Sequence, residues 1–335
     1  MDNHNLTLQP LSMINILTLR YDPSIKTNLP TKTWKDFQPK NNPPSIEFIE
    51  KSICYSIEQT LKKFDEQKIS IALSGGVDST LVLSLIRKVK PDIDIEAISI
   101  KFADSVDETS TASKIAETFN ASHNILYLEN YLSELPKAIS SIKLPFWDLH
   151  WYYVVKKSQT ISKILISGDG GDELFGGYTF RYNKFLSLTS ESSTPLEKIK
   201  AYLQCHERDR VPDQEHIFTK KSNFSWNVIH QTLLPYFDNK LSRLEQVYLA
   251  DYNGKLLYNF NPINTRIIDN FNMKMLAPIL NDELVSLGPH MPSSYKYDES
   301  DNIGKLPLRA ILKKNGYDSL VTKKKLGFNV NTINL

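Results

Sequence analysis

The chain has 335 residues, of which 41% are hydrophobic and 23% are charged, and its formal net charge is +2. This composition is typical of a globular protein with one large core or two domains, and the near-neutral charge neither requires nor excludes nucleic acid or a membrane as a partner. The longest apolar runs have the length of a strand, far below the ~20 residues of a membrane-spanning helix, which argues against an integral membrane protein.

The amino end and the cysteines indicate the compartment. The first ten residues, MDNHNLTLQP, lack a basic segment followed by an apolar core, so we predict no signal peptide. Cys54 and Cys205 form neither a CxxC pair nor a disulfide framework and are interpreted as unrelated free thiols. Together these features predict a cytoplasmic protein.

Residues 1–44 are predicted to form an N-terminal extension. Met13–Leu19 (MINILTL) is interpreted as a short strand, and the five prolines that follow, among Asn, Lys and Thr, indicate an irregular arm without a core of its own. A helix is expected to begin at Ser45, because Ile49 and Ile53 follow with helical spacing behind an acidic first turn.

From Lys68 onward, apolar runs of strand length alternate with helical stretches. The predicted strands are Ile69–Leu73, Ile93–Phe102, Asn124–Leu128 and Ile164–Ser167. This alternation is typical of an α/β protein with a doubly wound, mainly parallel sheet. Right-handed crossovers bring the carboxyl ends of such strands to one edge, where open α/β sheets bind ligands. We assign this core to residues 45–185, and a mostly helical region that completes the substrate site to residues 186–335.

The first glycine turn is SGGVDS, Ser74–Ser79, between a predicted strand and a predicted helix. A helix N-terminus offers free N–H groups and partial positive charge to a phosphate, and glycine lets the backbone approach it closely. Asp78 would then face the phosphates, which is favourable only with a cation between them, so we interpret it as a Mg²⁺ ligand. The Walker pattern GxxxxGK[ST] is absent. The alternative is a tight turn that merely caps a helix.

The second glycine turn lies in Lys163–Tyr178, KILISGDGGDELFGGY, where an apolar run leads into an acidic, glycine-rich segment. It follows the fourth predicted strand, so both turns are expected at the same edge of the sheet. Two such turns, each with a carboxylate, are what a magnesium–nucleotide site requires.

Several motifs resemble those of one family. SGGVDS resembles the pyrophosphate loop of N-type ATP pyrophosphatases, the PP-loop superfamily, and SGDGGDELFGGY resembles the synthetase domain of asparagine synthetases and their relatives, which include β-lactam synthetases. Three shorter segments are similar to the family patterns PFxD, GKxxLR and KxGF: Pro145–Asp148 (PFWD), Gly304–Arg309 (GKLPLR) and Lys325–Phe328 (KLGF). The resemblance implies a PP-loop, adenine nucleotide alpha-hydrolase-like fold.

The same resemblance implies roles for individual residues. It implies ATP and Mg²⁺ as cofactors, with the metal on Asp78 and Asp172. It implies that Asp169 acts on the intermediate and that Lys325 stabilises developing negative charge. The residues implied to bind the nucleotide are Leu73, Ser74, Gly75, Gly76, Asp78, Ser79, Ile100 and Gly168.

Two departures from the family pattern concern the substrates. Residue 2 is Asp where glutamine-hydrolysing members carry their nucleophilic Cys, and about sixty residues precede the first turn where the family has about two hundred, so we expect no glutaminase domain. In Met273–Asn281 (MKMLAPILN), which resembles the family's LExRxPFLD, the usual Glu, Arg and Asp are replaced by Lys274, Leu276 and Asn281. Reversing a charge near a substrate pocket changes which ligand is tolerated.

We therefore predict an AMP-forming carbon–nitrogen ligase of asparagine-synthetase type, active in amino-acid biosynthesis. It would adenylate a carboxylate, with aspartate as the favoured substrate, and take ammonia from solution or from a separate glutaminase subunit. One alternative is a specialised amide- or ring-forming synthetase, and another is a non-catalytic nucleotide-binding subunit. Nucleic acid and membrane are not expected as partners, and a homodimer stays open.

Overall fold

The computed structural model describes residues 9–64, 66–102, 107–130, 132–143, 149–207 and 210–322. The chain divides into two compact units, each assembled from two separate stretches of sequence. Residues 39–177 and 263–335 form one, here named the sheet unit, and residues 1–38 and 178–262 form the other, the helical unit. The predicted division at residues 44 and 185 follows chain order, whereas both units bring distant stretches together.

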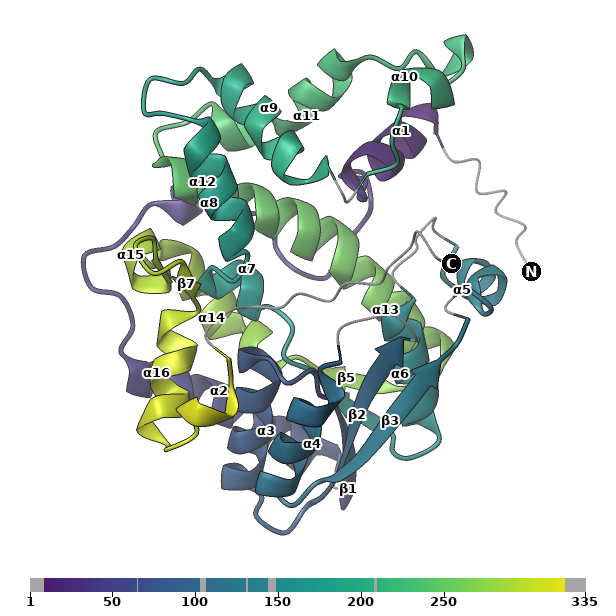
Figure 1. The fold of residues 1–335 in the computed structure, drawn as a ribbon, viewed down its shortest axis with the longest axis vertical. Helices are drawn as coiled ribbons and strands as arrows, with labels where there is room; N and C mark the ends of the chain where they lie inside the picture. Colours follow the sequence, from purple (N-terminus) through teal and green to yellow (C-terminus); the bar gives the residue numbers. More distant parts are fainter. Residues whose placement is uncertain are drawn as a thin grey trace. The chain divides into compact units, whose positions relative to one another are not determined.

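The sheet unit contains a five-stranded parallel sheet in the order β3-β2-β1-β4-β5 (Figure 1). The strands are β1 Lys68–Ala72, β2 Asp94–Phe102, β3 Ser122–Leu128, β4 Ile164–Ile166 and β5 Lys274–Leu276. This arrangement confirms the predicted α/β class with a parallel sheet, and the four predicted strands are present. The short strand β5 was not predicted.

Helices cover both faces of this sheet. The helices of the unit are α2 Ile46–Phe64, α3 Val77–Val89, α4 Thr109–Thr118, α5 Leu135–Ile142, α6 His150–Gln159, α7 Gly171–Phe175, α13 Asn261–Asn270, α14 Asp282–Leu287, α15 Ser293–Lys296 and α16 Leu306–Lys314. Because the chain runs from β1 to β3 in one direction and returns to β4 in the other, right-handed crossovers place α3 and α4 on one face and α6 on the opposite face. The order of the strands reverses between β1 and β4, which is the switch point where such sheets bind ligands.

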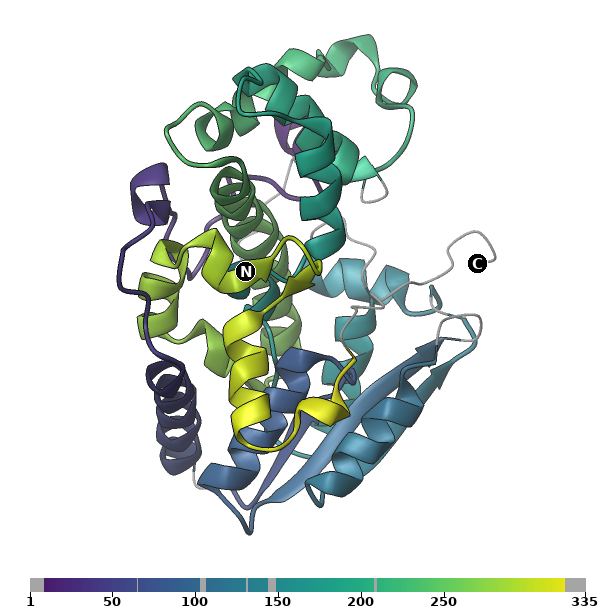
Figure 2. The same cartoon turned by 60° about the vertical axis from the view of Figure 1, so that its left-hand side comes forward.

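Two charged residues hold α16 in place beside the sheet. Its apolar side, which includes Leu308 and Ile311, is buried, and the helix packs against α2 and α3 (Figure 2). At its end, Lys314 Nζ lies 3.1 Å from Glu50 of α2, a nearly buried carboxylate that also accepts a 2.7 Å bond from Lys88 of α3. The start of α16 is thereby fixed beside the carboxyl ends of the strands.

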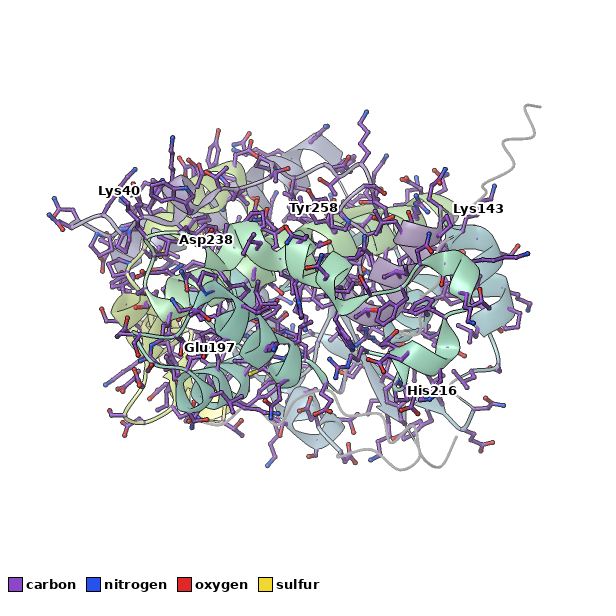
Figure 3. All side chains as sticks on the ribbon, turned by 90° about the horizontal axis from the view of Figure 1, so that it is seen from above. Lys40, Lys143, Glu197, His216, Asp238 and Tyr258 are labelled. Atoms are coloured by element: carbon purple, nitrogen blue, oxygen red, sulfur yellow. The ribbon has the colours of Figure 1, made fainter. Side chains whose placement is uncertain are left out.

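The helical unit contains α1 Pro10–Leu19, α8 Thr179–Leu188, α9 Pro195–Cys205, α10 Gln214–Ile217, α11 Trp226–Phe237, α12 Arg243–Asp251 and a π-helix, η4, Tyr252–Phe260. Glu197 in the first turn of α9, which is labelled in Figure 3, closes a capping box with Thr194. Across the described residues, no helix combines the length and the apolar character needed to cross a membrane.

The prediction of a strand at Met13–Leu19 is wrong, because this segment belongs to α1. Pro10 occupies the first turn, where its fixed φ favours a helix, and Arg20 ends the helix in the left-handed region with φ +65°. Residues 9–38 are also not the arm without a core that the sequence predicts. Their side chains Ile14, Ile16 and Phe37 are buried, at most 3% exposed. A short apolar run does not by itself distinguish a buried helix from a strand.

Candidate functional site

The first glycine turn joins β1 to α3, as predicted. Gly75 adopts a positive φ of +74°, a conformation that favours glycine. Gly76 is the N-cap of α3 and has no side chain that could cap the helix, so the amino end of the helix presents backbone N–H groups. The Ser74 and Ser79 hydroxyls lie 3.2 Å apart across the turn. This is the geometry in which a helix N-terminus and two hydroxyls bind a phosphate.

The second glycine turn joins β4 to α7 and lies against the first. The strands β1 and β4 are neighbours, with Ile71 paired to Ile166. Gly168 comes directly after β4 and lies against the start of α3. A Cβ atom at this position would lie 2.8 Å from Asp78 Cβ and 2.8 Å from Ser79 N. A Cβ at Gly171 would collide with the Asp78 carboxylate. Glycine is therefore required in this turn by close backbone approach to the aspartate.

The two aspartates that the sequence singled out converge on one cation, which is Lys305. Its Nζ lies 2.7 Å from Asp172 Oδ1 and also contacts Asp78 Oδ2. Lys305 is 7% exposed and has a positive φ of +61° at the N-cap of α16, while its N–H donates a 3.0 Å bond to the Phe175 carbonyl. A bulky side chain in the left-handed region is strained, and such strain persists where the surroundings fix it.

The charges of this cluster support one another. Burial by itself lowers the pKa of Lys305, but the carboxylates of Asp172 and Asp78 outweigh burial and raise the pKa above its ordinary value. Lys305 is therefore charged at neutral pH. Lys305 lies within the GKLPLR motif, for which no role was predicted, and the motif match was the signal that could have identified it.

The donor set at this edge is compatible with Mg²⁺ when a phosphorylated ligand is present. Within the described ranges, no cluster of three or more His, Cys, Asp and Glu side chains forms a metal site on its own. Mg²⁺ in proteins typically takes one or two carboxylates and completes its shell with water and phosphate oxygens. Asp78 and Asp172 provide two carboxylates at the mouth of a phosphate-type turn, and their role as metal ligands stays a prediction.

Asp169 lies in the second turn beside Asn264 of α13. The Asn264 Nδ2 atom donates a 3.2 Å hydrogen bond to Asp169 Oδ2. Burial raises the pKa of Asp169 to about 6, opposed by hydrogen bonds from Ser167 and Asn264 and reinforced by the negative charge of Asp78. A carboxylate with this pKa is ionised at neutral pH and accepts a proton more readily than an ordinary one. Asn264 was not predicted, because it is 95 residues away in sequence.

The raised pKa of Asp169 predicts a pH-dependent effect of Asp169→Asn. The folded state binds the proton more tightly than the unfolded state, so the stability that Asp169 provides is complete below about pH 4 and is lost as the pH rises to about 6. Above pH 7 the charged side chain lowers the free energy of unfolding by at most about 2–3 kcal/mol relative to the protonated side chain. We therefore expect Asp169→Asn to gain stability relative to the parent between pH 4 and pH 7, measured by urea unfolding at each pH. A difference that is constant with pH would contradict this assignment.

The residues predicted to flank a nucleoside lie side by side on β1 and β2. The Leu73 N–H donates a 2.9 Å hydrogen bond to the Ile98 carbonyl, and the Ser99 hydroxyl donates a 2.6 Å hydrogen bond to the Leu73 carbonyl. Ile100 follows near the end of β2 and is partly buried. The structure thus brings Leu73 and Ile100 to the same edge as the two turns, and their contact with a nucleoside stays a prediction.

The close approach at Gly168 gives a second prediction. In Gly168→Ala, the new Cβ would displace the backbone at Ser79, so we expect a loss of about 1–3 kcal/mol in the free energy of unfolding and a weaker response to ATP. Urea unfolding with and without ATP measures both. The control is Gly288→Ala, because the nearest atoms that a Cβ there would meet belong to the Leu174 side chain, the first at 3.3 Å. Equal behaviour of the two variants would contradict the argument.

The segment that departs from the family's substrate pattern forms β5 and the turn after it. Lys274 is exposed and pairs with Ile164 at the amino end of the strands, opposite the edge of the glycine turns. Asn281 is the N-cap of α14: its Oδ1 accepts bonds from Leu284 N–H and from the Ser52 hydroxyl. These positions give Lys274 no contact with the turns and give Asn281 a structural role.

Two groups of predicted residues cannot be located. Lys325, with its motif Lys325–Phe328, and the segment Pro145–Asp148 lie outside the described residues. The catalytic role of Lys325 therefore stays a prediction from the sequence. The other predicted residues, from Leu73 to Asp172, are described and gather at the switch point between β1 and β4.

This fold and this edge define the class of the protein: an α/β protein whose two glycine turns meet at the switch point of a parallel sheet, where such sheets bind ligands. The family model described as asparagine synthase matches residues 58–334, so the chain belongs to the asparagine synthase family.

Individual relatives are more distant. The chain is 29% identical over 137 residues to the glutamine-hydrolyzing asparagine synthetase 1 of Bacillus subtilis (strain 168), covering 39% of this chain and 21% of the relative. It is 34% identical over 118 residues to a protein of Methanocaldococcus jannaschii provisionally named glutamine-hydrolyzing asparagine synthetase 2, covering 34% of this chain and 23% of the relative. These matches span about a fifth of each relative.

The solved structure of NMN synthetase from Francisella tularensis is 16% identical, with a TM-score of 0.35, and covers 63% of this chain and 94% of its own. A likeness of that size supports no conclusion about activity.

Proposed function

We propose that the protein is an ATP-dependent amide ligase that adenylates a carboxylate and then transfers the acyl group to an amine. The observation that carries this proposal is the convergence of Asp78 and Asp172 on one cation where two glycine turns meet. Membership of the asparagine synthase family supports it.

The first step would occur at the first turn. A substrate carboxylate oxygen attacks the α-phosphorus of ATP, the bond from that phosphorus to the bridging oxygen breaks, and pyrophosphate leaves. The N–H groups at the start of α3 and the hydroxyls of Ser74 and Ser79 would hold the departing phosphates. When bound at Asp78 and Asp172, Mg²⁺ would neutralise charge on these oxygens. Lys305 would supply positive charge at the same place.

The second step forms the amide. The amine nitrogen attacks the acyl carbon, the bond from that carbon to the AMP oxygen breaks, and AMP leaves. The attacking nitrogen must lose a proton, and Asp169 is suited to accept it because burial raises its pKa to about 6. Asn264 would orient that carboxylate by its hydrogen bond to Oδ2.

Lys325 gives a test of the first step. We expect Lys325→Ala to release pyrophosphate about 10²–10³-fold more slowly, because one preorganised positive group aimed at developing charge is worth this much. Pyrophosphate release is measured with saturating ATP and Mg²⁺. Lys313→Ala, an exposed lysine of α16, serves as the control. A rate within threefold of the parent, about 0.6 kcal/mol, would remove Lys325 from the mechanism.

Aspartate and ammonia are the proposed substrates, as the names of the relatives suggest, and a separate glutaminase is the proposed alternative source of ammonia. The test is pyrophosphate release with ATP, Mg²⁺, aspartate and ammonium, followed by amino-acid analysis for asparagine. Omission of aspartate and omission of ammonium are the controls.

The outcomes of this test separate the alternatives. Turnover with another carboxylate or amine, and none with aspartate, would make the protein a specialised amide- or ring-forming synthetase. ATP binding without pyrophosphate from any carboxylate, with or without a glutaminase, would favour a non-catalytic nucleotide-binding subunit.

A further inference from the structure

A chain of hydrogen bonds runs through the sheet behind the first glycine turn, and His123 of β3 stands at its centre. The His123 Nε2 atom lies 2.8 Å from Ser99 Oγ of β2. On the other side of the ring, Nδ1 lies 2.9 Å from Ser113 Oγ of α4. The ligase reaction described above gives none of these three side chains a role.

The direction of each bond in this chain follows from the groups that take part. The Ser99 hydroxyl donates its one proton to the Leu73 carbonyl, at 2.6 Å, because a carbonyl only accepts. Ser99 Oγ therefore accepts from His123 Nε2, which must carry a hydrogen. Burial lowers the pKa of His123, so the ring is neutral at neutral pH and its Nδ1 accepts from the Ser113 hydroxyl. The chain thus holds His123 as the tautomer with its hydrogen on Nε2.

The chain ends on the peptide unit that opens the first glycine turn. The carbonyl of this unit is that of Leu73, and its N–H is that of Ser74, which donates a 3.3 Å bond to Ser79 Oγ. The peptide plane is therefore held at both ends, by Ser99 and by Ser79. Because Ser79 Oγ accepts from this N–H, its own proton is directed elsewhere, and its contact with the Gly76 carbonyl is long, at 3.4 Å. A phosphate oxygen would accept that proton more strongly.

The helix at the other end of the chain, α4, is held on two sides. Near its start it lies against the turn itself, since a Cβ at Gly75 would be 3.3 Å from Thr111 Cγ2. Just beyond its last residue, Arg87 of α3 donates a 2.8 Å bond to the Phe119 carbonyl. The helix is therefore a fixed support for Ser113, which begins the chain.

The loss of His123 would affect more than one bond. Ser99 is 5% exposed, so its oxygen has little access to water as a replacement donor. Hydrogen bonds in a chain polarise one another, so removing the donor at Nε2 also weakens the bond from Ser99 to the Leu73 carbonyl. The peptide unit before the glycine turn is then less firmly held.

We propose that His123 is a positioning residue of the nucleotide site: through Ser99 it fixes the peptide unit between Leu73 and Ser74, and this unit orients the Ser79 hydroxyl toward the phosphates. The inference rests on the proposed ATP-dependent function. It gives His123 no contact with a substrate and no proton transfer, so its effect falls on the binding of ATP and not on the chemical step.

Two amide variants distinguish this hydrogen bond from packing alone. In His123→Gln the amide nitrogen reaches the place of Nε2 and can still donate to Ser99, whereas the shorter amide of His123→Asn reaches only the place of Nδ1. We expect His123→Asn to weaken ATP binding about three- to tenfold, the size of one net hydrogen bond, and His123→Gln to stay within about twofold of the parent. Titration calorimetry of the full chain with ATP and Mg²⁺ measures both. His216→Asn, at an exposed histidine of α10, is the matched control.

Pyrophosphate release gives a second readout. In His123→Asn the KM for ATP should rise, while kcat at saturating ATP should stay within about twofold of the parent. Ser99→Ala should behave in the same way. The double variant should bind ATP no more weakly than Ser99→Ala, because both substitutions break the same chain.

The tautomer of His123 is measured in the parent protein, so this test does not depend on any variant being folded. Long-range proton–nitrogen NMR spectra should show the hydrogen on Nε2, and a hydrogen on Nδ1 would overturn the direction of the chain. Unchanged ATP affinity in His123→Asn, or equal losses in His123→Asn and His123→Gln, would overturn the positioning role and leave the proposed function standing. If the parent protein itself binds no ATP, both the proposed function and this role are wrong.

Discussion

Replacing Lys305 by Met is expected to lower the free energy of unfolding by about 3–5 kcal/mol at neutral pH. The ammonium of Lys305 contacts the carboxylates of both Asp78 and Asp172, and it is almost fully buried. Removing it takes away the ammonium that offsets two negative charges lying close together. This loss is larger than that from most single substitutions.

Urea unfolding measures the effect, with Lys313→Met as the control. Lys313 is an exposed lysine of the same helix, so its replacement should change stability by no more than about 0.5 kcal/mol. The triple variant Lys305→Met, Asp78→Asn, Asp172→Asn should recover most of the lost stability, because neutral isosteres remove the repulsion. A cost below 1 kcal/mol for Lys305→Met alone would show that the cluster is not electrostatically coupled.

The same variant also tests the metal assignment. If Asp78 and Asp172 bind Mg²⁺, the cation should stabilise Lys305→Met more than the parent protein, because it takes the place of the missing ammonium. The comparison is the unfolding midpoint with MgCl₂ and with a chelator. Equal shifts in the two proteins would argue against a metal on these carboxylates.

Neutralising either aspartate is expected to abolish most pyrophosphate release. Asp78→Asn and Asp172→Asn should each reduce the rate about 10²–10³-fold, because each removes a ligand of the cation that offsets charge on the phosphates. The structural reason is their shared position at the junction of the two turns. Pyrophosphate release under saturating substrates is the measurement.

The control is Asp92→Asn, an exposed aspartate between α3 and β2. It should retain the parent rate, and circular dichroism should show the same helix content in all three variants. If Asp78→Asn and Asp172→Asn both keep more than half of the activity while Asp169→Asn is inactive, the metal-assisted mechanism is wrong and Asp169 alone accounts for the chemistry.

The sheet and its two turns could be predicted because their signals are local. In SGGVDS and SGDGGDELFGGY, glycine and aspartate follow directly on a buried strand, and the right-handed crossover rule then places both turns at one edge. Only the pattern of the chain was needed for this. The structure confirms the parallel sheet that the pattern indicates.

Features that depend on few residues or on distant partners could not be predicted. Strand β5 has three residues, too few for a periodic pattern, and its pairing with β4 joins positions 110 residues apart, as in Ile164 with Lys274. The sequence predicts a strand at α1 because MINILTL is mostly apolar and short, and the helix signal at Pro10 lies outside that run. Tertiary packing decides both cases.

Lys305, the cation at the centre of the site, could not be predicted for the same reason, because its partners are distant in sequence. Lys305 is 227 residues from Asp78 in sequence, and only the packing of α16 on α2 and α3 brings them together. The GKLPLR motif marked the segment, but no rule of spacing indicates that its lysine contacts two specific carboxylates. Asn264 and Asp169 are a second pair of this kind.

The lysine at the start of α16 acts as a built-in counterion. Because it is tethered to the chain, the paired aspartates are compensated without recruiting an ion from solution, and salt screens this compensation less than it screens a surface ion pair. A ligand that brings its own divalent cation must share the carboxylates with this ammonium or displace it. Binding of a divalent cation at the switch point would then be an exchange between that cation and the ammonium of a lysine of the chain itself.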